Sequence, residues 1–447
     1  MSDALAHLPH DLVQQALKSG ADAAEAVIAE RQSLSVGVRL GQLEEVEREE
    51  SREIGLRVFV GQRQASVSAS DLSPATAARL VERAVAMARL APEDPYTGLA
   101  PDEKLARGPH PDLQLFDPSE PPSAQTLEHR ARAAEDAARA VPGVANSEGG
   151  SASWSSGGWR LVTSAGFEGV HRGSASSLSA SVIAGEGSAM ERGGDGRTTR
   201  WVEDLPSPEA IGRMAGERAV RRLGARKIDS QTAPVIIENR IAGSILSAFV
   251  GAISGAAVAR GVSFLKDRMG DQVFSEAITI VDDPFRPRGL ASAPFDDEGV
   301  RVEERAIVDR GVLTTWLLNT SSARQLGLDS TGHASRGSAG PAGISAHNLH
   351  IVPGTKDLVG LMGEAGRGLL VTAMFGPSLN ANTGDWSAGV SGFWFEGGEI
   401  AYPVTEITIA GALPELYRRL VAGSDLEFRG SVNAPSLLID GVAIAGK

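Results

Sequence analysis

The sequence contains no cysteine among its 447 residues. Disulfide bonds, thiolate zinc sites and cysteine nucleophiles are therefore excluded. Aromatic residues are also scarce, at 5 % of the chain, whereas glycine occurs 52 times. This composition suits tight turns and backbones that pack closely together. The hydrophobic content of 42 % and charged content of 22 % are typical of a globular protein rather than a disordered one.

Positive charge is in deficit, and the formal net charge is −13. This balance argues against free nucleic acid or an anionic membrane as a partner. Residues 241–259 carry no charge and have the length of a membrane span, but they are mostly Gly, Ala and Ser and lack flanking Trp or Tyr. Residues 1–20 lack a basic start followed by an apolar run, so we expect no signal peptide and a cytoplasmic location.

The length of the chain predicts two or three domains, because it exceeds what one ordinary core supports. We place an N-terminal α+β domain at 1–123, including a Pro-rich linker at 91–123, then a middle α+β segment at 124–231 and a C-terminal β-rich domain at 232–447. The predicted fold class is α+β: an N-terminal helix-and-sheet lobe is followed by a β-dominated C-terminal lobe, with a central buried helix.

Local patterns define several elements of the N-terminal half. Residues 8–18 are predicted to be a short helix, and Ser73-Pro74 is a good start for a second helix that ends near Leu90. Strands are expected at 26–29 and 34–40. The Glu- and Arg-rich stretch LEEVEREESRE is interpreted as a solvated edge strand or hairpin arm. The alternating stretch that follows it predicts a hairpin with its turn at Gly61.

The central apolar run predicts a helix over 240–258, with Asn239 as its cap. Its apolar face consists of Ile241, Ile245, Phe249 and Ile253. A second face carries only small residues, namely Ser244, Ser247, Gly251, Ser254 and Gly255. The pattern by itself favours a buried core helix that packs tightly on a sheet.

Longer stretches around this helix resemble a known family. They are PVIIENRIAGSILSAFVGAISGAAVARG, SFLKDRMGDQVFSEAITIVDDP and FDDEGVRVEERAIVDRGVLTTWLLNTSSARQLGLDSTGHA. Together they resemble the TldD/PmbA metallopeptidases. The later stretch GLLVTAMFGPSLNANTGDWSAGVSGFWFEGGEIAYPVTEITIAG is especially similar to the PmbA (TldE) branch. The resemblance covers nearly the whole chain, and FDDEG, STGH, GDWS and GFWFEGGEI together make it specific.

This resemblance bears on metal chemistry. In the TldD branch the corresponding helix carries His-Glu-x-x-x-His, and a Cys supplies the third zinc ligand. Here Ser247, Ala248 and Ala252 stand at the positions of the first His, the Glu and the second His. The resemblance therefore implies vestigial positions on a helix that lines a chamber, no metal and no cofactor in this chain, and zinc in a partner chain.

Several histidines, two acidic groups and one polar loop are further candidates for metal or peptide binding. His347 and His350 are three positions apart in a predicted strand and would point to opposite faces, so we expect His333 and His347 to face solvent or a peptide rather than a metal. Asp282-Asp283 and the acidic group 296–298 are interpreted as turn-capping carboxylates. The polar loop at 378–387 is a candidate peptide-binding loop through Asn380, Asn382, Asp385 and Trp386.

The leading hypothesis is a non-catalytic, zinc-less subunit, a pseudo-enzyme, of a TldD/PmbA-type peptidase that binds and degrades or trims unfolded peptides. Its expected partners are a TldD-type catalytic subunit and a peptide, without nucleic acid or membrane, and a homodimer also remains open. One alternative is a homodimeric peptide-binding or regulatory protein. Another is a self-sufficient hydrolase with an unrecognised site, such as one built on His333 and His347. A Ser247 nucleophile is disfavoured because no base or oxyanion hole is evident around it.

Overall fold

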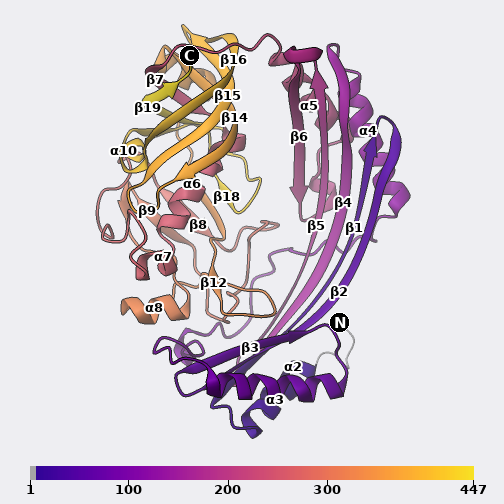
Figure 1. The fold of residues 1–447 in the computed structure, drawn as a ribbon, viewed down its shortest axis with the longest axis vertical. Coiled ribbons are helices and arrows are strands. Elements are labelled where there is room, and N and C mark those ends of the chain that lie inside the picture. Colours follow the sequence, from indigo (N-terminus) through magenta and orange to yellow (C-terminus); the bar gives the residue numbers. More distant parts are fainter. Residues whose placement is uncertain (1–6) are drawn as a thin grey trace.

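The computed structural model describes residues 7–447, and the first six residues of the predicted N-terminal domain lie outside it. Two parts face each other across the molecule (Figure 1). One is a long curved sheet backed by helices, and the other combines a small barrel with a second sheet. The contents of 24 % helix and 40 % strand confirm the predicted α+β class.

The long sheet contains strands from the first half of the chain, each antiparallel to its neighbours. In sheet order they are β3 (Arg63–Ala69), β2 (Gln42–Val60), β1 (Ala23–Arg39), β4 (Val144–Thr163), β5 (Glu168–Ala184) and β6 (Glu191–Thr199). Segments on both sides of the Pro-rich linker thus contribute to one sheet. The strands expected at 26–29 and 34–40 are one strand, because residues 30–33 pair with both β2 and β4.

Helices cover one face of this sheet at its two ends. They are α2 (Leu8–Lys18), α3 (Pro74–Leu90), α4 (Ala124–Arg139) and α5 (Pro208–Arg221). The last three begin in the same way, since Ser73, Ser123 and Ser207 each accept a hydrogen bond from the backbone N–H three residues later. Two apolar cores form beneath the helices, one under α2 and α3 and one under α4 and α5.

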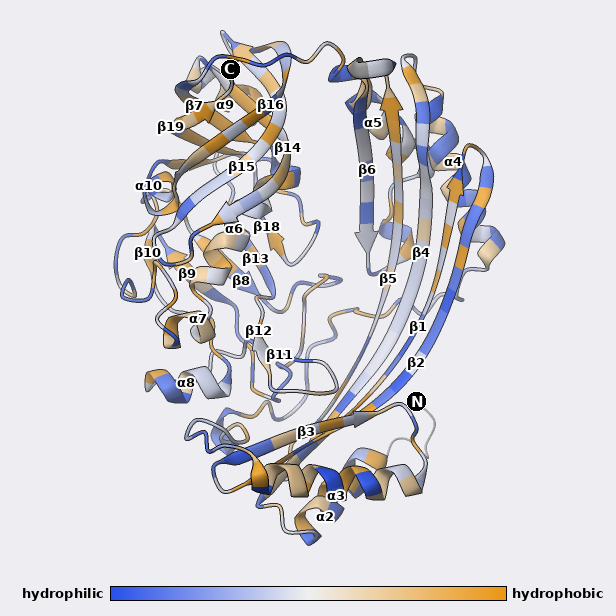
Figure 2. Cartoon of the chain, viewed as in Figure 1, coloured by the Kyte–Doolittle hydropathy of each residue, from blue (hydrophilic) through white to orange (hydrophobic). Residues whose placement is uncertain are grey.

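The outer half of β2 is an exposed sheet edge. Strand β3 pairs only with residues 54–60 of β2, and residues 42–52 are all exposed. Figure 2 shows this arm as mainly hydrophilic. The predicted solvated hairpin arm and the turn at Gly61 are therefore confirmed. Charged side chains on a free edge discourage pairing with another chain.

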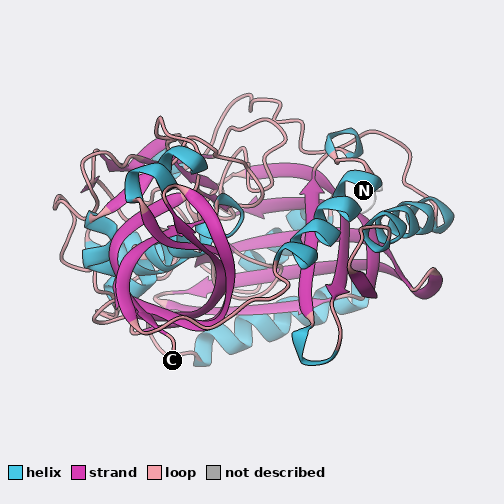
Figure 3. Ribbon diagram, turned by 90° about the horizontal axis from the view of Figure 1, so that it is seen from above, coloured by secondary structure: helices cyan, strands magenta, loops and turns pink. Residues whose placement is uncertain are grey.

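The C-terminal part contains a closed ring of strands, seen from above in Figure 3. The strands are β7 (Gln231–Ile237), β14 (Arg367–Leu379), β15 (Asp385–Glu396), β16 (Glu399–Ala412) and β19 (Leu437–Ala445), with β17 (Leu420–Ala422) added beside β19. The ring closes because β19 pairs with both β7 and β16. Helices α9 (Leu358–Ala365) and α10 (Leu413–Arg418) lie against it.

A second sheet lies between the barrel and the N-terminal end of the long sheet (Figure 1). Its strands, in order, are β10 (Val312–Leu313), β9 (Arg305–Asp309), β8 (Ile280–Asp283), β13 (Asn348–Ile351) and β18 (Val432–Asn433). A small hairpin, β11 (Ala334–Ser335) with β12 (Gly343–Ile344), projects toward the long sheet. Short helical pieces elsewhere in the chain are α8 (Thr320–Leu326), η1 (Asp102–Lys104), η2 (Gly187–Ala189) and η3 (Val202–Asp204).

The central helix is shorter than predicted. It divides into α6 (Asn239–Ala252) and α7 (Gly255–Ala259). The break occurs because residues 253–255 bond to another segment: Leu317 donates to the carbonyl of Ile253 and accepts from Gly255. Asn239 is not the cap either. Its side chain donates instead to the carbonyl of Asp425.

The predicted apolar face of α6 is confirmed, because Ile245 and Phe249 are buried and Ile241 packs partly buried against the same core. Across residues 7–447, none of the helices combines the length and the apolar character needed to cross a membrane.

Candidate functional site

The small face of α6 is open. Ser244, Ser247 and Gly251 are exposed, whereas Ala252 is buried. The hydroxyl of Ser247 donates 3.0 Å to the carbonyl of Gly243 in its own helix, so it has no base positioned to activate it. None of these residues offers an imidazole, thiolate or carboxylate.

A cavity of about 670 Å³ lies between the long sheet and the first turn of α6. The sheet contributes mostly small residues from β1, β4, β5 and β6, together with four carboxylates, those of Glu44 and Glu45 on β2, Glu148 and Asp195. The opposite wall is formed by Arg240 and Arg429. A smaller hollow of about 370 Å³ continues along α6 past Ser244. Segments far apart in sequence therefore line two neighbouring hollows that share Arg240 and Arg429 beside the start of α6.

The polar lining is partly satisfied by the protein itself. Arg240 donates to Glu238 at 3.1 Å and to the carbonyl of Thr372 at 2.7 Å. Arg429 pairs with Glu427 at 2.6 Å. Each guanidinium nevertheless has a buried Nε atom without a hydrogen-bond partner in the described part of the chain. A space lined by both charge signs and by the edge strand β6 suits an extended polar ligand such as a peptide.

The loop predicted to bind peptide is a tight turn that satisfies its own polar groups. Asn380 accepts from the backbone of Asn382, and Thr383 donates to the carboxylate of Asp385. Asn380, Asn382 and Asp385 are exposed, as a contact loop requires. Trp386 is different: only 6 % of it is exposed, and it belongs to the barrel core. The expectation that Trp386 contacts a ligand was wrong, because its position on β15 turns the ring inward.

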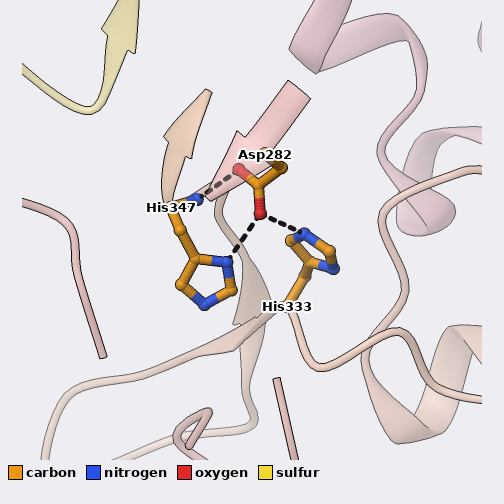
Figure 4. Close-up of side chains that lie close together, drawn as sticks. All are labelled: Asp282, His333 and His347. Atoms are coloured by element: carbon orange, nitrogen blue, oxygen red, sulfur yellow. Dashed lines mark hydrogen bonds and ion pairs between the residues drawn. The ribbon is translucent and has the colours of Figure 1, made fainter. Parts of the chain in front are cut away.

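The expectation that His333 and His347 face solvent or a peptide was also wrong. They are 1 % and 8 % exposed and converge on Asp282 of β8 (Figure 4). The Oδ2 atom of Asp282 lies 3.0 Å from Nε2 of His333 and 2.8 Å from Nδ1 of His347. The other oxygen, Oδ1, accepts the backbone N–H of His347 at 2.8 Å. These residues form a buried Asp–His–His cluster.

Each side chain of this cluster comes from a different segment. Asp282 is on β8, His333 directly precedes β11, and His347 directly precedes β13. Burial raises the pKa of Asp282, but hydrogen bonds from His333 and His347 outweigh it and hold that pKa well below its usual range. Burial lowers the pKa of His333, so its neutral form is favoured.

The sequence carried only a weak signal for this cluster. The STGH and SAHN stretches were visible, but Asp282 lies fifty-one and sixty-five residues before the two histidines. Spacing along the chain cannot reveal a contact made by strand pairing across β8 and β13. The predicted divergence of His350 is confirmed, since its ring lies against Phe428 instead.

Two of the carboxylates that were predicted to cap turns, those of Asp283 and Asp296, do accept backbone N–H groups in turns. Asp283 accepts the backbone N–H of Phe285, and Asp296 accepts those of Glu298 and Val300. For Asp282 that prediction was wrong, because that carboxylate binds histidines.

Glu298 forms an ion pair with the long sheet, because one of its carboxylate oxygens lies 3.8 Å from a guanidinium nitrogen of Arg57 on β2. Burial raises the pKa of Asp297 to about 6, with the charge of His347 opposing the shift.

Comparison with known proteins assigns the family. Models of the PmbA/TldA metallopeptidase family match at residues 24–88 (domain 1), 116–223 (central domain) and 230–446 (C-terminal domain). The chain is 40 % identical over 433 residues to metalloprotease PmbA of Escherichia coli O157:H7, which covers 96 % of this chain and 94 % of that protein. The chain belongs to the PmbA/TldD metallopeptidase family.

A second curated relative and two solved structures are also similar to this chain. The PmbA homologue of Haemophilus influenzae is 38 % identical and covers 97 % of this chain and 94 % of its own. A Bacteroides thetaiotaomicron protein, provisionally named a modulator of DNA gyrase, superposes with a TM-score of 0.93 at 27 % identity and covers 100 % of both chains. TldE of Thermococcus kodakarensis shares the fold, with a TM-score of 0.88 at 23 % identity over 98 % of this chain and 100 % of its own.

Membership of a metallopeptidase family implies a metal, and α6 does not fit one. Ser247 uses its hydroxyl within the helix, and Ala248 and Ala252 end in methyl groups. A methyl group cannot bind zinc, and a general base is missing from this face of α6. We therefore derive no reaction step through a metal at this helix.

Proposed function

We propose that this chain is a non-catalytic subunit of a peptidase assembled with a zinc-bearing, TldD-type member of the same family. The observation that carries the proposal is the chemistry of α6, on which exposed Ser247, partly buried Ala248 and buried Ala252 offer neither a zinc ligand nor a general base. A chain of this kind depends on its partner for hydrolysis, and the zinc belongs to that partner.

The role left to this chain is to hold an unfolded peptide. Support comes from the cavity of about 670 Å³ beside α6, which both lobes line with small residues and with Arg240 and Arg429. Strand β6 is the edge of the long sheet, since it pairs only with β5, and its residues 194–196 line the cavity. A free sheet edge binds extended peptides without demanding a particular sequence. The exposed turn with Asn380, Asn382 and Asp385 remains a proposed contact for the same peptide.

The test uses the full chain and a TldD-type relative from the same source, each purified alone and then mixed. Cleavage of an unstructured peptide is followed by mass spectrometry, with and without a chelator. We expect no cleavage by this chain alone and chelator-sensitive cleavage by the mixture. Cleavage at the same rate by the relative alone would contradict the subunit role.

Two variants of this chain sharpen the test. Ser247→Ala should leave cleavage by the mixture unchanged, because the hydroxyl bonds only within α6. Arg429→Ala removes one wall of the cavity and should raise KM for the peptide with a smaller effect on kcat. A loss of activity in Ser247→Ala would instead point to chemistry in this chain.

A second candidate function is a self-sufficient hydrolase, and the Asp–His–His cluster is the observation in its favour. Its burial weighs against it, since Asp282 and His333 are 0 % and 1 % exposed and a catalytic centre must admit substrate. Chelator-sensitive cleavage by the pure chain would favour this candidate. Peptide binding by a homodimer, without cleavage in any mixture, would favour the regulatory alternative.

A further inference from the structure

The Asp–His–His cluster has the composition and convergence of a metal centre. Among residues 7–447 it is the group of three or more His, Asp or Glu side chains whose ligand atoms come together, all within 4.8 Å of one another. Figure 4 shows both imidazoles directed at the same carboxylate oxygen from different sides. Two imidazoles and a carboxylate are a ligand set that zinc and other divalent transition metals use.

The distances require only a small opening to admit an ion. Zinc sits about 2.0–2.1 Å from nitrogen and oxygen ligands, which places tetrahedral ligands roughly 3.3 Å apart. The Asp282 oxygen is now 3.0 Å from His333 and 2.8 Å from His347. The Asp282 oxygen would therefore move back from each ring by a few tenths of an ångström, while the two ring nitrogens, now within 4.8 Å of each other, would turn toward the ion. On each neutral imidazole the proton of the coordinating nitrogen would pass to the other ring nitrogen.

The surroundings of His333 accommodate that change of tautomer. Its Nδ1 atom lies 2.8 Å from the hydroxyl of Thr331, which can also donate to the carbonyl of Leu318 at 3.3 Å. With Nε2 protonated, Thr331 donates to Nδ1. With a metal on Nε2, Nδ1–H donates to Thr331 and the hydroxyl turns to Leu318. Such an outer partner fixes the tautomer and orientation of a metal-binding histidine.

The local charges are mixed but permit a cation. Asp282 supplies one negative charge in contact with both rings, and Asp297 is close enough to interact electrostatically with His347. Arg305 faces His333 and opposes a cation there. Both histidines coordinate as neutral imidazoles, so they add no positive charge to the site. The negative charge that offsets the bound cation therefore comes from the Asp282 carboxylate.

We propose that Asp282, His333 and His347 bind a divalent transition metal, with zinc the best match, as a structural site. Because the ligands are 0 %, 1 % and 8 % exposed, the site is closed to substrate, unlike a catalytic centre. Its three protein ligands leave the fourth position of a tetrahedral ion to a water molecule. It is separate from α6 and independent of the proposed function.

The site lies at the base of the β11–β12 hairpin, since His333 and His347 bracket residues 334–346. The tip of this hairpin makes one of the contacts between the lobes: Arg336 pairs with Glu25 of β1, and the carbonyl of Ser338 lies against Gly55 of β2. A metal that clamps residues 333 and 347 to β8 would hold the hairpin in position for that contact. It would thereby stabilise the arrangement of the two lobes.

The test uses the full chain without a histidine tag, stripped with a chelator and then titrated with Zn²⁺ and with Co²⁺. We expect about one metal ion per chain and the visible absorption of tetrahedral Co²⁺. Hydrogen exchange in residues 334–346 should slow at least several-fold when zinc is bound. Neither readout depends on peptidase activity, so this proposal and the proposed function can fail separately.

Matched variants locate the ion. His347→Gln and the near-isosteric Asp282→Asn should each weaken Zn²⁺ binding by at least about 100-fold, while circular dichroism checks that both remain folded. His350→Gln, three residues from His347 but outside the cluster, should bind like the unaltered chain. No binding by the folded unaltered chain, or equal binding by the cluster variants, would overturn the proposal and leave a hydrogen-bond network only.

Discussion

His171 shows how one half-buried ring couples stability to pH. It lies on β5, stacked on Trp159 with ring centroids 5.2 Å apart, and burial together with the charge of Arg200 lowers its pKa from 6.5 to about 4. The unfolded chain therefore takes up a proton on His171 in a pH range where the folded chain does not. The contribution of neutral His171 to the free energy of unfolding is fully present above about pH 6.5 and is lost as the pH falls toward 4.

We expect His171→Gln to remove a large part of this loss. The shift corresponds to about 3 kcal/mol in the free energy of unfolding between pH 7 and pH 4. Urea unfolding at several pH values measures it, and His129→Gln, on the exposed side of α4, is the control. An unchanged pH slope in His171→Gln would contradict the assignment.

Single residues were also the hardest feature to predict from the sequence. The sequence singled out His333, His347 and Trp386, but the environment of each depends on partners distant along the chain. Trp386 faces the barrel core because of the pairing of β15 with β14 and β16. His333 is buried because strand β8 brings Asp282 to it. A side chain's exposure follows from tertiary pairing, which local patterns do not encode.

At the level of elements, glycine packing distinguishes two helices. Gly212 of α5 lies so close to α4 that an added Cβ would meet the carbonyl oxygen of Ala134 at 2.0 Å. An added Cβ at Gly251 of α6 would meet nothing within 4 Å. The same substitution should therefore have opposite effects at these two helical positions.

We expect Gly212→Ala to destabilise the protein by about 1–3 kcal/mol, because α4 and α5 must move apart. Gly251→Ala should stabilise it by about 0.5–1 kcal/mol, since alanine loses less backbone entropy in a helix. Thermal and urea unfolding of both variants provide the comparison. Equal changes of one sign would show that helix propensity, not the close approach, decides both.

Element boundaries were predictable where the signal is local. Serine caps and the following proline place the start of α3 and α5, and the helix at 8–18 is confirmed at both ends. The prediction of one helix over 240–258 was wrong because its end is set by Leu317, which bonds to residues 253 and 255. The apolar face of α6 was nonetheless predicted, since it follows from helical periodicity.

For the whole molecule, a buried charge cluster joins the two lobes. Glu25 of β1 pairs with Arg57 of β2 at 2.7 Å and also with Arg336 from the β11–β12 hairpin. Glu25, Arg57 and Arg336 have side chains no more than 5 % exposed. Removing the shared carboxylate would leave two buried guanidinium groups with less compensation.

We expect Glu25→Gln to cost about 3–5 kcal/mol in the free energy of unfolding and to increase protease cleavage in the hairpin. The control is Glu50→Gln on the same sheet, where the ion pair with Arg48 is 62 % and 70 % exposed and should contribute about 0–1 kcal/mol. Comparable losses in the two variants would show that the contact between the lobes adds little.

The closure of the barrel has a consequence for synthesis of the chain. Strand β19 forms the seams with both β7 and β16, so the ring cannot close before residues 437–445 are made. Strand β7 ends at Ile237, roughly 200 residues earlier. At about 5–20 residues per second, a ribosome needs some 10–40 s to cover that interval. During this time β7 presents an apolar edge without its final neighbour, which makes the nascent C-terminal part a natural client for chaperones.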